Sequence, residues 1–328
     1  MPFLPPLARA AGVLEIIDGP KPVPFADMAR CMMDIVRMNG LFGGRRVTMI
    51  PVKRLLAALP ADHLITVLDV GTGAADIPRE VVRWARREGR RIRVFALDRD
   101  AATLQLAGQV VRDYPEITFV RGDALSLPIR PGSIDLAISA MTLHHLEPAA
   151  GTRFFSEMDT AARMGFVVND LVRSRIAHAV VWLITRFITR SAISRHDGPL
   201  SVRRSYTPRE VRGLCEKAGV ADVNVVHHWP YLRLCAVRDQ CGRGGGRWRK
   251  RASVSPATIL DEEAGRETPV PDCPDGARSC HVRLRRVRVG AVATDRYLRR
   301  TGRARLIADR GRRDLHDVGR VHNRDRWT

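Results

Sequence analysis

Residues 65–76 read ITVLDVGTGAAD, and this stretch decides the fold. Its apolar first half is typical of a buried strand, and the glycines that follow predict a tight turn into a helix. Gly71 and Gly73 let the backbone approach a small ligand at the helix N-terminus, as nucleotide-binding turns of α/β proteins do. The stretch therefore predicts the first strand, glycine loop and helix of a doubly wound α/β domain.

The acids beside this turn indicate which ligand it suits. Asp69 ends the predicted strand and Asp76 opens the helix, so a pyrophosphate would meet two like charges. The dinucleotide fingerprint Gly-x-Gly-x-x-Gly also fails, because its third glycine would fall on Asp76. S-adenosylmethionine carries a sulfonium and an ammonium and has no phosphate. We therefore expect S-adenosylmethionine as the cofactor.

The next predicted strands repeat this arrangement of an apolar run followed by an acid. Residues 93–98 end at Asp98, whose carboxylate can accept hydrogen bonds from both ribose hydroxyls. Residues 117–120 lead to Asp123, which can accept one from an adenine amino group. A fourth strand is predicted at residues 134–139. Because ligands bind at the carboxyl ends of parallel strands, we expect these ends to line one crevice.

These motifs resemble the class I S-adenosylmethionine-dependent methyltransferases, in particular the small-molecule branch that includes the ubiquinone and menaquinone biosynthesis C-methyltransferases. The resemblance covers roughly residues 25–238 and rests on residues 67–73, Asp98, residues 122–124 and residues 143–146. It implies a Rossmann-like, mainly parallel seven-stranded sheet. It also implies methyl transfer to oxygen or carbon of a small aromatic, quinone-like or polyketide-derived acceptor. A likeness to methyltransferases of bacterial secondary metabolism rests on residues 38–44, 167–171 and 195–201.

The resemblance also implies which residues hold the cofactor. The methionine end is expected at Asp69, Gly71 and Gly73, the ribose at Asp98, and the adenine at Asp123 and Ala124. The complete expected set is Asp69, Gly71, Thr72, Gly73, Asp76, Asp98, Arg99, Asp123, Ala124 and Ser139. Ala75 departs from the family, which often has a third glycine at this position.

Three histidines are candidates for the catalytic base. Methyl transfer is an in-line displacement, so positioning can supply most of the acceleration, and a base is needed only for some acceptors. His144 and His145 follow the fourth predicted strand, and His196 follows the expected cap. A structural alternative stays open, in which the first two pack their turn and His196 is solvated. The expected substrate contacts are Asn39, Asn169 and Tyr206.

The net charge of +20 invites a nucleic-acid interpretation, which the motifs do not favour. Of 55 basic residues 51 are arginine, a bias typical of GC-rich genomes. Base-amino methylation usually needs an Asn/Asp-Pro-Pro-aromatic turn, whereas residues 139–142 read SAMT. A nucleic-acid methyltransferase and a non-catalytic cofactor-binding relative are therefore the alternatives to a small-molecule enzyme. No stable protein partner is implied.

The six cysteines form no C-x-x-C pair and no zinc spacing, so we expect no metal and a reducing cytoplasm. Residues 1–24 lack the features of a signal peptide and are expected to be an N-terminal extension. Residues 241–328 hold 22 basic and 11 acidic residues without an apolar face. We expect this Arg-rich tail to be disordered or an out-of-frame translation, and dispensable.

The methyltransferase domain is expected at residues 25–240, with a helical lid at residues 25–60 and an inserted cap at residues 171–200. Within the lid, apolar residues at a spacing of three to four predict helices at residues 25–41 and 45–59. The cap helix, residues 175–193, is too short and too interrupted by arginines to span a bilayer. Its tryptophan and arginines suit a membrane surface, so a peripheral membrane contact is the alternative to a simple cap.

Overall fold

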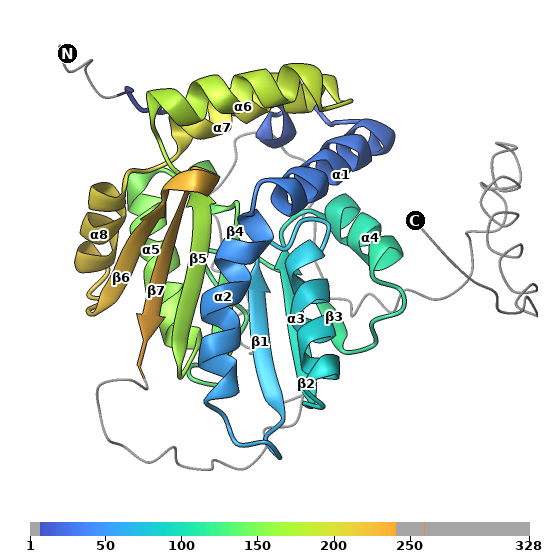
Figure 1. The fold of residues 1–328 in the computed structure, drawn as a ribbon, viewed down its shortest axis with the longest axis vertical. Helices are drawn as coiled ribbons and strands as arrows, with labels where there is room; N and C mark the ends of the chain where they lie inside the picture. The colour runs from blue at the N-terminus through green and yellow to red at the C-terminus, as the bar shows by residue number, and fades with distance from the viewer. Residues whose placement is uncertain (1–6, 241–258, 260–328) are drawn as a thin grey trace, which may run out of the picture. The chain divides into compact units, whose positions relative to one another are not determined.

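The computed structural model of the chain describes residues 7–240 and Ile259, and their core is one seven-stranded sheet (Figure 1). The strand order is β3-β2-β1-β4-β5-β7-β6, and β7 runs antiparallel to both of its neighbours. The strands are β1 (Ile65–Val70), β2 (Ile92–Asp98), β3 (Ile117–Arg121), β4 (Leu136–Ala140), β5 (Gly165–Leu171), β6 (Val223–His228) and β7 (Arg233–Asp239). The predicted Rossmann-like, mainly parallel sheet is confirmed.

Helices cover both faces of the sheet and its carboxyl-end edge. The α-helices are α1 (Phe25–Leu41), α2 (Gly44–Ala57), α3 (Asp76–Arg87), α4 (Ala101–Val110), α5 (Pro148–Ala161), α6 (Arg175–Phe187), α7 (Ala192–Arg204) and α8 (Pro208–Lys217). Short 3-10 turns are η1 (Ile16–Asp18), η2 (Leu143–His145) and η3 (Trp229–Tyr231). The arrowheads of the parallel strands point toward α1, α6 and α7 (Figure 1).

The central strands are mainly apolar because helices cover both of their faces. Every residue of β1 and of β5 is buried. Successive side chains of a strand point to opposite faces, so Val67 and Leu68 join two different core clusters. The cluster around Leu68 includes Phe154 of α5, and the cluster around Val67 includes Leu56 of α2. This double cover holds the strand ends, and thus the glycine loop, on a rigid support.

The expected lid at residues 25–60 divides into two helices with different positions. α1 has the predicted bounds and packs against α2, α4 and α7 near the ligand edge. α2 packs instead on the face of the sheet against β4, β5 and β7, because Val52 and Leu56 are fully buried in the core there. The prediction that both helices form the lid is therefore wrong for α2.

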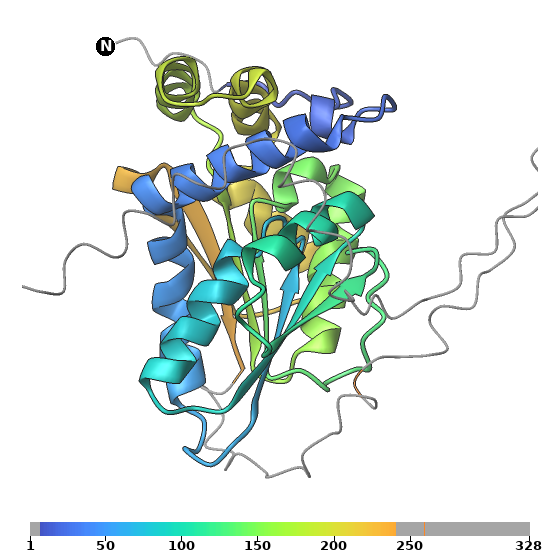
Figure 2. The same cartoon turned by 90° about the vertical axis from the view of Figure 1, so that its right-hand side faces the viewer.

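The inserted cap contains two helices rather than the one helix predicted at residues 175–193. α6 ends at Phe187 and α7 starts at Ala192, and the two lie side by side next to α1 (Figure 2). The Asp34 carboxylate of α1 accepts hydrogen bonds from the backbone N–H groups of Arg190 and Ser191, both at 3.0 Å. Both amides belong to the linker that precedes α7, so Asp34 attaches this linker to α1.

The segments outside the predicted domain lie partly within the described structure. Residues 7–24 contact α7, and the Ala10 amide donates to the Arg203 carbonyl at 3.0 Å. Of the tail, only Ile259 is described: its side chain is buried in the core and its carbonyl accepts from the Arg130 amide. The other predictions for residues 241–328 fall outside the described part.

None of the described helices combines the length and apolar character that crossing a bilayer requires.

Candidate active site

The glycine loop between β1 and α3 has the backbone conformation that its sequence predicts. Gly71 has φ +72° and Gly73 has φ +54°, values that disfavour residues with a Cβ. A Cβ on Gly71 would lie 2.2 Å from Oγ1 of Thr142, so the loop and the turn after β4 touch here. Beside Gly73 the space is open, since a Cβ at this position would meet only the Met32 sulfur, at 3.7 Å.

A direct hydrogen bond joins the ends of the first two strands. The Gly73 amide donates to Oδ2 of Asp98 at 3.0 Å, and the Asp100 amide donates to Oδ1 at 3.1 Å. Burial raises the pKa of Asp98, since a charged carboxylate loses hydration there. The residues expected to hold the methionine end and the ribose thus form one connected unit.

A cavity of about 670 Å³ lies between this sheet edge and the helices α1, α6 and α7. Its size suits a nucleoside together with a small acceptor. The structure brings to its wall the following predicted site residues: Asn39, Gly71, Thr72, Gly73, Asp76, Asp98, Arg99, Asp123, Ala124, His144 and His145.

Two predicted cofactor residues lie behind the wall of the cavity. Asp69 is 2% exposed, and its Oδ2 accepts a hydrogen bond from Oγ1 of Thr72 at 2.6 Å. Ser139 is equally buried and donates to the Val70 carbonyl at 2.7 Å. Both support the loop from below.

The structure does not bring Asn169, Tyr206 or His196 to the cavity wall. Asn169 is buried and donates to the Gly44 carbonyl at 3.1 Å, while the Tyr206 hydroxyl donates to the Leu146 carbonyl at 2.6 Å. His196 is more than half exposed, with Nδ1 2.8 Å from Asp197. The fold uses the Asn169 amide nitrogen and the Tyr206 hydroxyl, whereas the buried Oδ1 of Asn169 has no hydrogen-bond partner among the described residues.

Two buried carboxyl groups, those of Asp69 and Asp76, lie at or directly behind the floor of the cavity. Burial raises the pKa of Asp69 to about 7, and the nearby charges of Asp76 and Asp98 add to the effect. Burial also raises the pKa of Asp76, although Asn39 donates to it at 3.4 Å. A phosphate would increase the repulsion, whereas an ammonium or sulfonium would relieve it. The residues present therefore fit the cationic end of S-adenosylmethionine.

Arg233 is a site residue that the sequence motifs did not indicate. This arginine at the start of β7 is 4% exposed and lines the cavity, and its Nη2 donates to Oδ1 of Asn39 at 3.0 Å. Asn39 thereby connects the arginine to Asp76. The pair of opposite charges matches a zwitterionic amino-acid end. Arg233 stands among the apolar residues of 232–236, and this exception to the apolar pattern could have marked it in the sequence.

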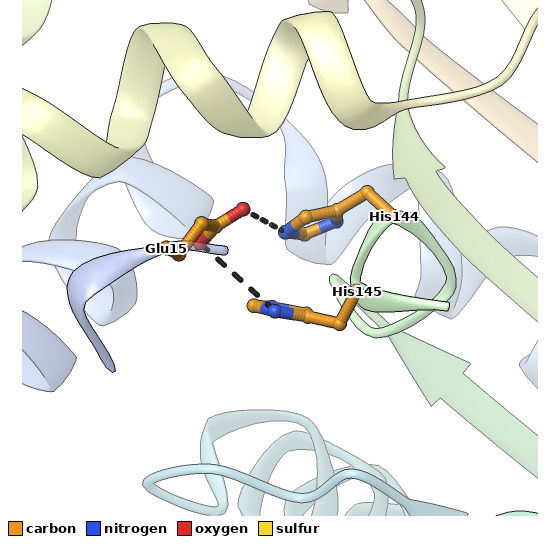
Figure 3. A group of neighbouring side chains, drawn as sticks. All are labelled: Glu15, His144 and His145. Atoms are coloured by element: carbon orange, nitrogen blue, oxygen red, sulfur yellow. Dashed lines mark ion pairs between the residues drawn. The ribbon is translucent and has the colours of Figure 1, made fainter. Parts of the chain in front are cut away.

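Glu15 and Asp18 of the N-terminal segment were not predicted either. Asp18 contacts Nδ1 of His145 and forms an ion pair with Arg99 at 2.5 Å. Glu15 is buried beside His144 (Figure 3). On its other side, His144 has Nδ1 2.7 Å from Oδ1 of Asp170. No motif marks the two acids in the sequence, because only the fold brings them to the turn after β4.

Comparisons with known proteins agree with this geometry. Residues 67–165 match the family model described as "Methyltransferase domain". Over 178 residues the chain is 44% identical to the 2-phytyl-1,4-naphtoquinone methyltransferase of Thermosynechococcus vestitus, a match that covers 51% of this chain and 76% of that protein. The chain belongs to the class I S-adenosylmethionine-dependent methyltransferases.

Solved methyltransferase structures are also similar to this chain. One is a SAM dependent methyltransferase from Aquifex aeolicus, at 19% identity and TM-score 0.41, covering 56% of this chain and 87% of that one. Another is human N-acetylserotonin methyltransferase, at 14% identity and TM-score 0.46, covering 66% of this chain and 57% of that one.

Membership in this class confirms three predictions made from the sequence. The protein is a methyltransferase, its cofactor is S-adenosylmethionine, and its acceptor is a small molecule. The nucleic-acid alternative is not favoured.

Replacing Asp98 by alanine tests the assignment of the ribose site. Asp98→Ala removes the carboxylate expected to accept from the ribose and strands the Gly73 amide, so affinity for S-adenosylmethionine should fall by on the order of 1–3 kcal/mol. Calorimetry measures this, and Asp113→Ala, which removes an exposed acid, is the matched control. Unchanged affinity in a folded Asp98→Ala protein would contradict the assignment.

Proposed function

We propose that the protein methylates oxygen or carbon of a quinone-like aromatic acceptor that carries an apolar substituent, in secondary metabolism. The supporting observation is the apolar half of the cavity. Between the cofactor loop and the cap, the wall consists of side chains from α1 and α6, namely Met32, Ile35, Val36, Val180, Val181 and Ile184. The 44% identical relative is named for a 2-phytyl-1,4-naphtoquinone, a molecule of this chemical class.

We assign the cofactor to one end of the cavity and the acceptor to the other. The strand ends would hold the cofactor, with Asp98 at the ribose, Asp123 at the adenine, and Asp76 with Arg233 at the amino-acid end. When bound there, S-adenosylmethionine supplies an electrophilic methyl group on its sulfonium. The helices α1 and α6 exclude water from the reacting atoms, and this exclusion together with alignment supplies most of the acceleration for a displacement.

His144 and His145 form the polar border between the two ends. Both imidazoles line the cavity, and their ring centroids are 4.1 Å apart. We propose that one of them receives a proton from an acceptor hydroxyl or ring carbon. His196 lies outside the cavity wall, so we leave it out of the proposed mechanism.

An assay with a reduced naphthoquinone tests the proposed function. With S-adenosylmethionine and 2-phytyl-1,4-naphthoquinol, the wild-type protein should form a product that carries one additional methyl group, and mass spectrometry detects it. A polar catechol without a side chain should react more slowly, because it leaves the apolar wall uncovered. Cofactor binding without product from any quinol or phenol would instead support the non-catalytic alternative.

We further propose that α6 contacts membranes in which such acceptors dissolve. Its outer face exposes Ile176, Trp182, Leu183 and Phe187, the last with 76% of its surface accessible. Arg175 and Arg186 lie on the same helix. An exposed apolar face with cationic residues suits the surface of an anionic bilayer.

Sedimentation with lipid vesicles tests this contact. The protein should bind vesicles containing phosphatidylserine at low salt, and Leu183→Ser with Phe187→Ser should reduce the bound fraction several-fold, because the helix loses its apolar anchors. Ile50→Ser is the matched control, since Ile50 is an exposed apolar residue of α2. Absence of binding at low salt, or equal loss in the control, would refute the membrane role.

The cytoplasmic location stays a prediction. The described cysteines, Cys31, Cys215 and Cys235, are free and buried, as a reducing compartment favours. Cell fractionation tests this location, and a secreted protein would contradict it.

A further inference from the structure

Three donor side chains from distant parts of the sequence meet at the mouth of the cavity (Figure 3). Glu15 comes from the N-terminal segment, and His144 and His145 come from the turn after β4. Nε2 of His144 lies 3.7 Å from Oε1 of Glu15, and Nδ1 of His145 lies 4.0 Å from Oε2. One ligand atom from each residue lies within 4.8 Å of the others.

These separations are too long for direct hydrogen bonds, which end near 3.2 Å. They are close to the spacing of donors that share one metal ion. With metal–ligand bonds of about 2.0–2.2 Å, two donors on one ion lie about 3–4 Å apart, depending on the angle between them. The two histidine–glutamate separations, 3.7 and 4.0 Å, fall in this range.

The supporting contacts orient the imidazole of His144 for this purpose. Its Nδ1 lies 2.7 Å from Oδ1 of Asp170, which also accepts from the backbone amide of His144 through Oδ2. Donation from Nδ1 leaves the lone pair of Nε2 directed at Glu15. Metal-binding histidines commonly have such a carboxylate on the opposite ring nitrogen, which fixes the ring and its tautomer.

The charges around the donors also favour a dication. Four carboxylates gather here, on Glu15, Asp18, Asp170 and Asp197. Two guanidinium groups face them, with Arg204 3.9 Å from Glu15 and Arg99 2.5 Å from Asp18. Carboxyl groups thus outnumber the guanidinium groups in a largely buried place, and a bound cation would reduce this imbalance.

We propose that Glu15, His144 and His145 bind one divalent first-row transition-metal cation of the Zn²⁺ class. Two imidazoles with carboxylates are a donor set that suits Zn²⁺ and Co²⁺ better than Mg²⁺ or Ca²⁺. The cation fastens the N-terminal segment onto the turn after β4, beside the acceptor space. Binding would take Nδ1 of His145 from its present contact with Asp18, and water would complete the coordination of the ion.

The site shares His144 and His145 with the border of the acceptor space, so a bound cation would take their place as proton acceptors. Its cation needs neither S-adenosylmethionine nor a particular acceptor, and Glu15 and Asp18 belong to a segment outside the matched residues 67–165. The inference can therefore fail while the methyltransferase assignment stands.

Titration of the metal-free full-length protein with Co²⁺ tests the site. After treatment with a chelator and its removal, the wild-type protein should bind one Co²⁺ per chain and develop visible absorption bands of a four- or five-coordinate ion. Zn²⁺ should displace it. Glu15→Gln keeps the size of the side chain and should weaken binding at least about tenfold, as should His145→Ala.

His196→Ala is the matched control, because His196 is an exposed histidine beside an aspartate outside the donor group. It should bind Co²⁺ like the wild type, and circular dichroism checks that each variant is folded. No binding by the wild type, or equal binding by wild type and Glu15→Gln, would overturn the proposal. The three side chains would then serve only as a polar contact between the N-terminal segment and the turn, or as the proton acceptors.

Discussion

Buried carboxylates at the carboxyl ends of β1 and β2 are the constraint on which the rest of the site depends. Asp69 and Asp76 are almost completely enclosed, and burial raises the pKa of each. Burying carboxyl groups without cationic partners lowers the stability of the ligand-free protein. A bound cationic ligand supplies the partner that these carboxyl groups lack. The glycine loop supplies the room for that ligand, and the bond between Gly73 and Asp98 holds the two strand ends together.

The acceptor space is built from different parts of the chain than the cofactor floor. The floor belongs to strand ends that are fixed by core packing on both faces of the sheet. The acceptor walls belong to α1, α6 and the N-terminal segment, which lie over that edge (Figure 1). This division lets the helices vary to suit an acceptor while the strand ends keep the cofactor site.

Features that depend on contacts between neighbouring residues could be predicted from the sequence. The turn from β1 into α3 and the bounds of α1 were predicted because glycine and helix signals act over a few neighbouring residues. The sequence was insufficient where partners are distant. Asp18 meets His145 across 127 positions, and Arg233 meets Asn39 across 194.

The same limit explains the other differences between prediction and structure. Asp34 of α1 holds the linker between α6 and α7, and this contact comes from a residue outside the cap. Asn169 and Tyr206 were plausible substrate contacts by residue type, yet their hydrogen bonds go to backbone carbonyls of the fold. Residue type indicates what a side chain can do, whereas the fold determines which partner it meets.

Proton release on binding of S-adenosylmethionine tests the central claim most directly. With a pKa of about 7, Asp69 is mostly protonated near pH 6 in the free protein, and a bound cation favours its ionised form. Calorimetry in two buffers of different ionisation enthalpy should show proton release near pH 6 and tighter binding near pH 7.5, with release reduced in Asp69→Asn. The account would be contradicted if binding of S-adenosylmethionine released no proton and its affinity did not rise with pH. It would also be contradicted if NAD occupied the cleft and prevented S-adenosylmethionine from binding.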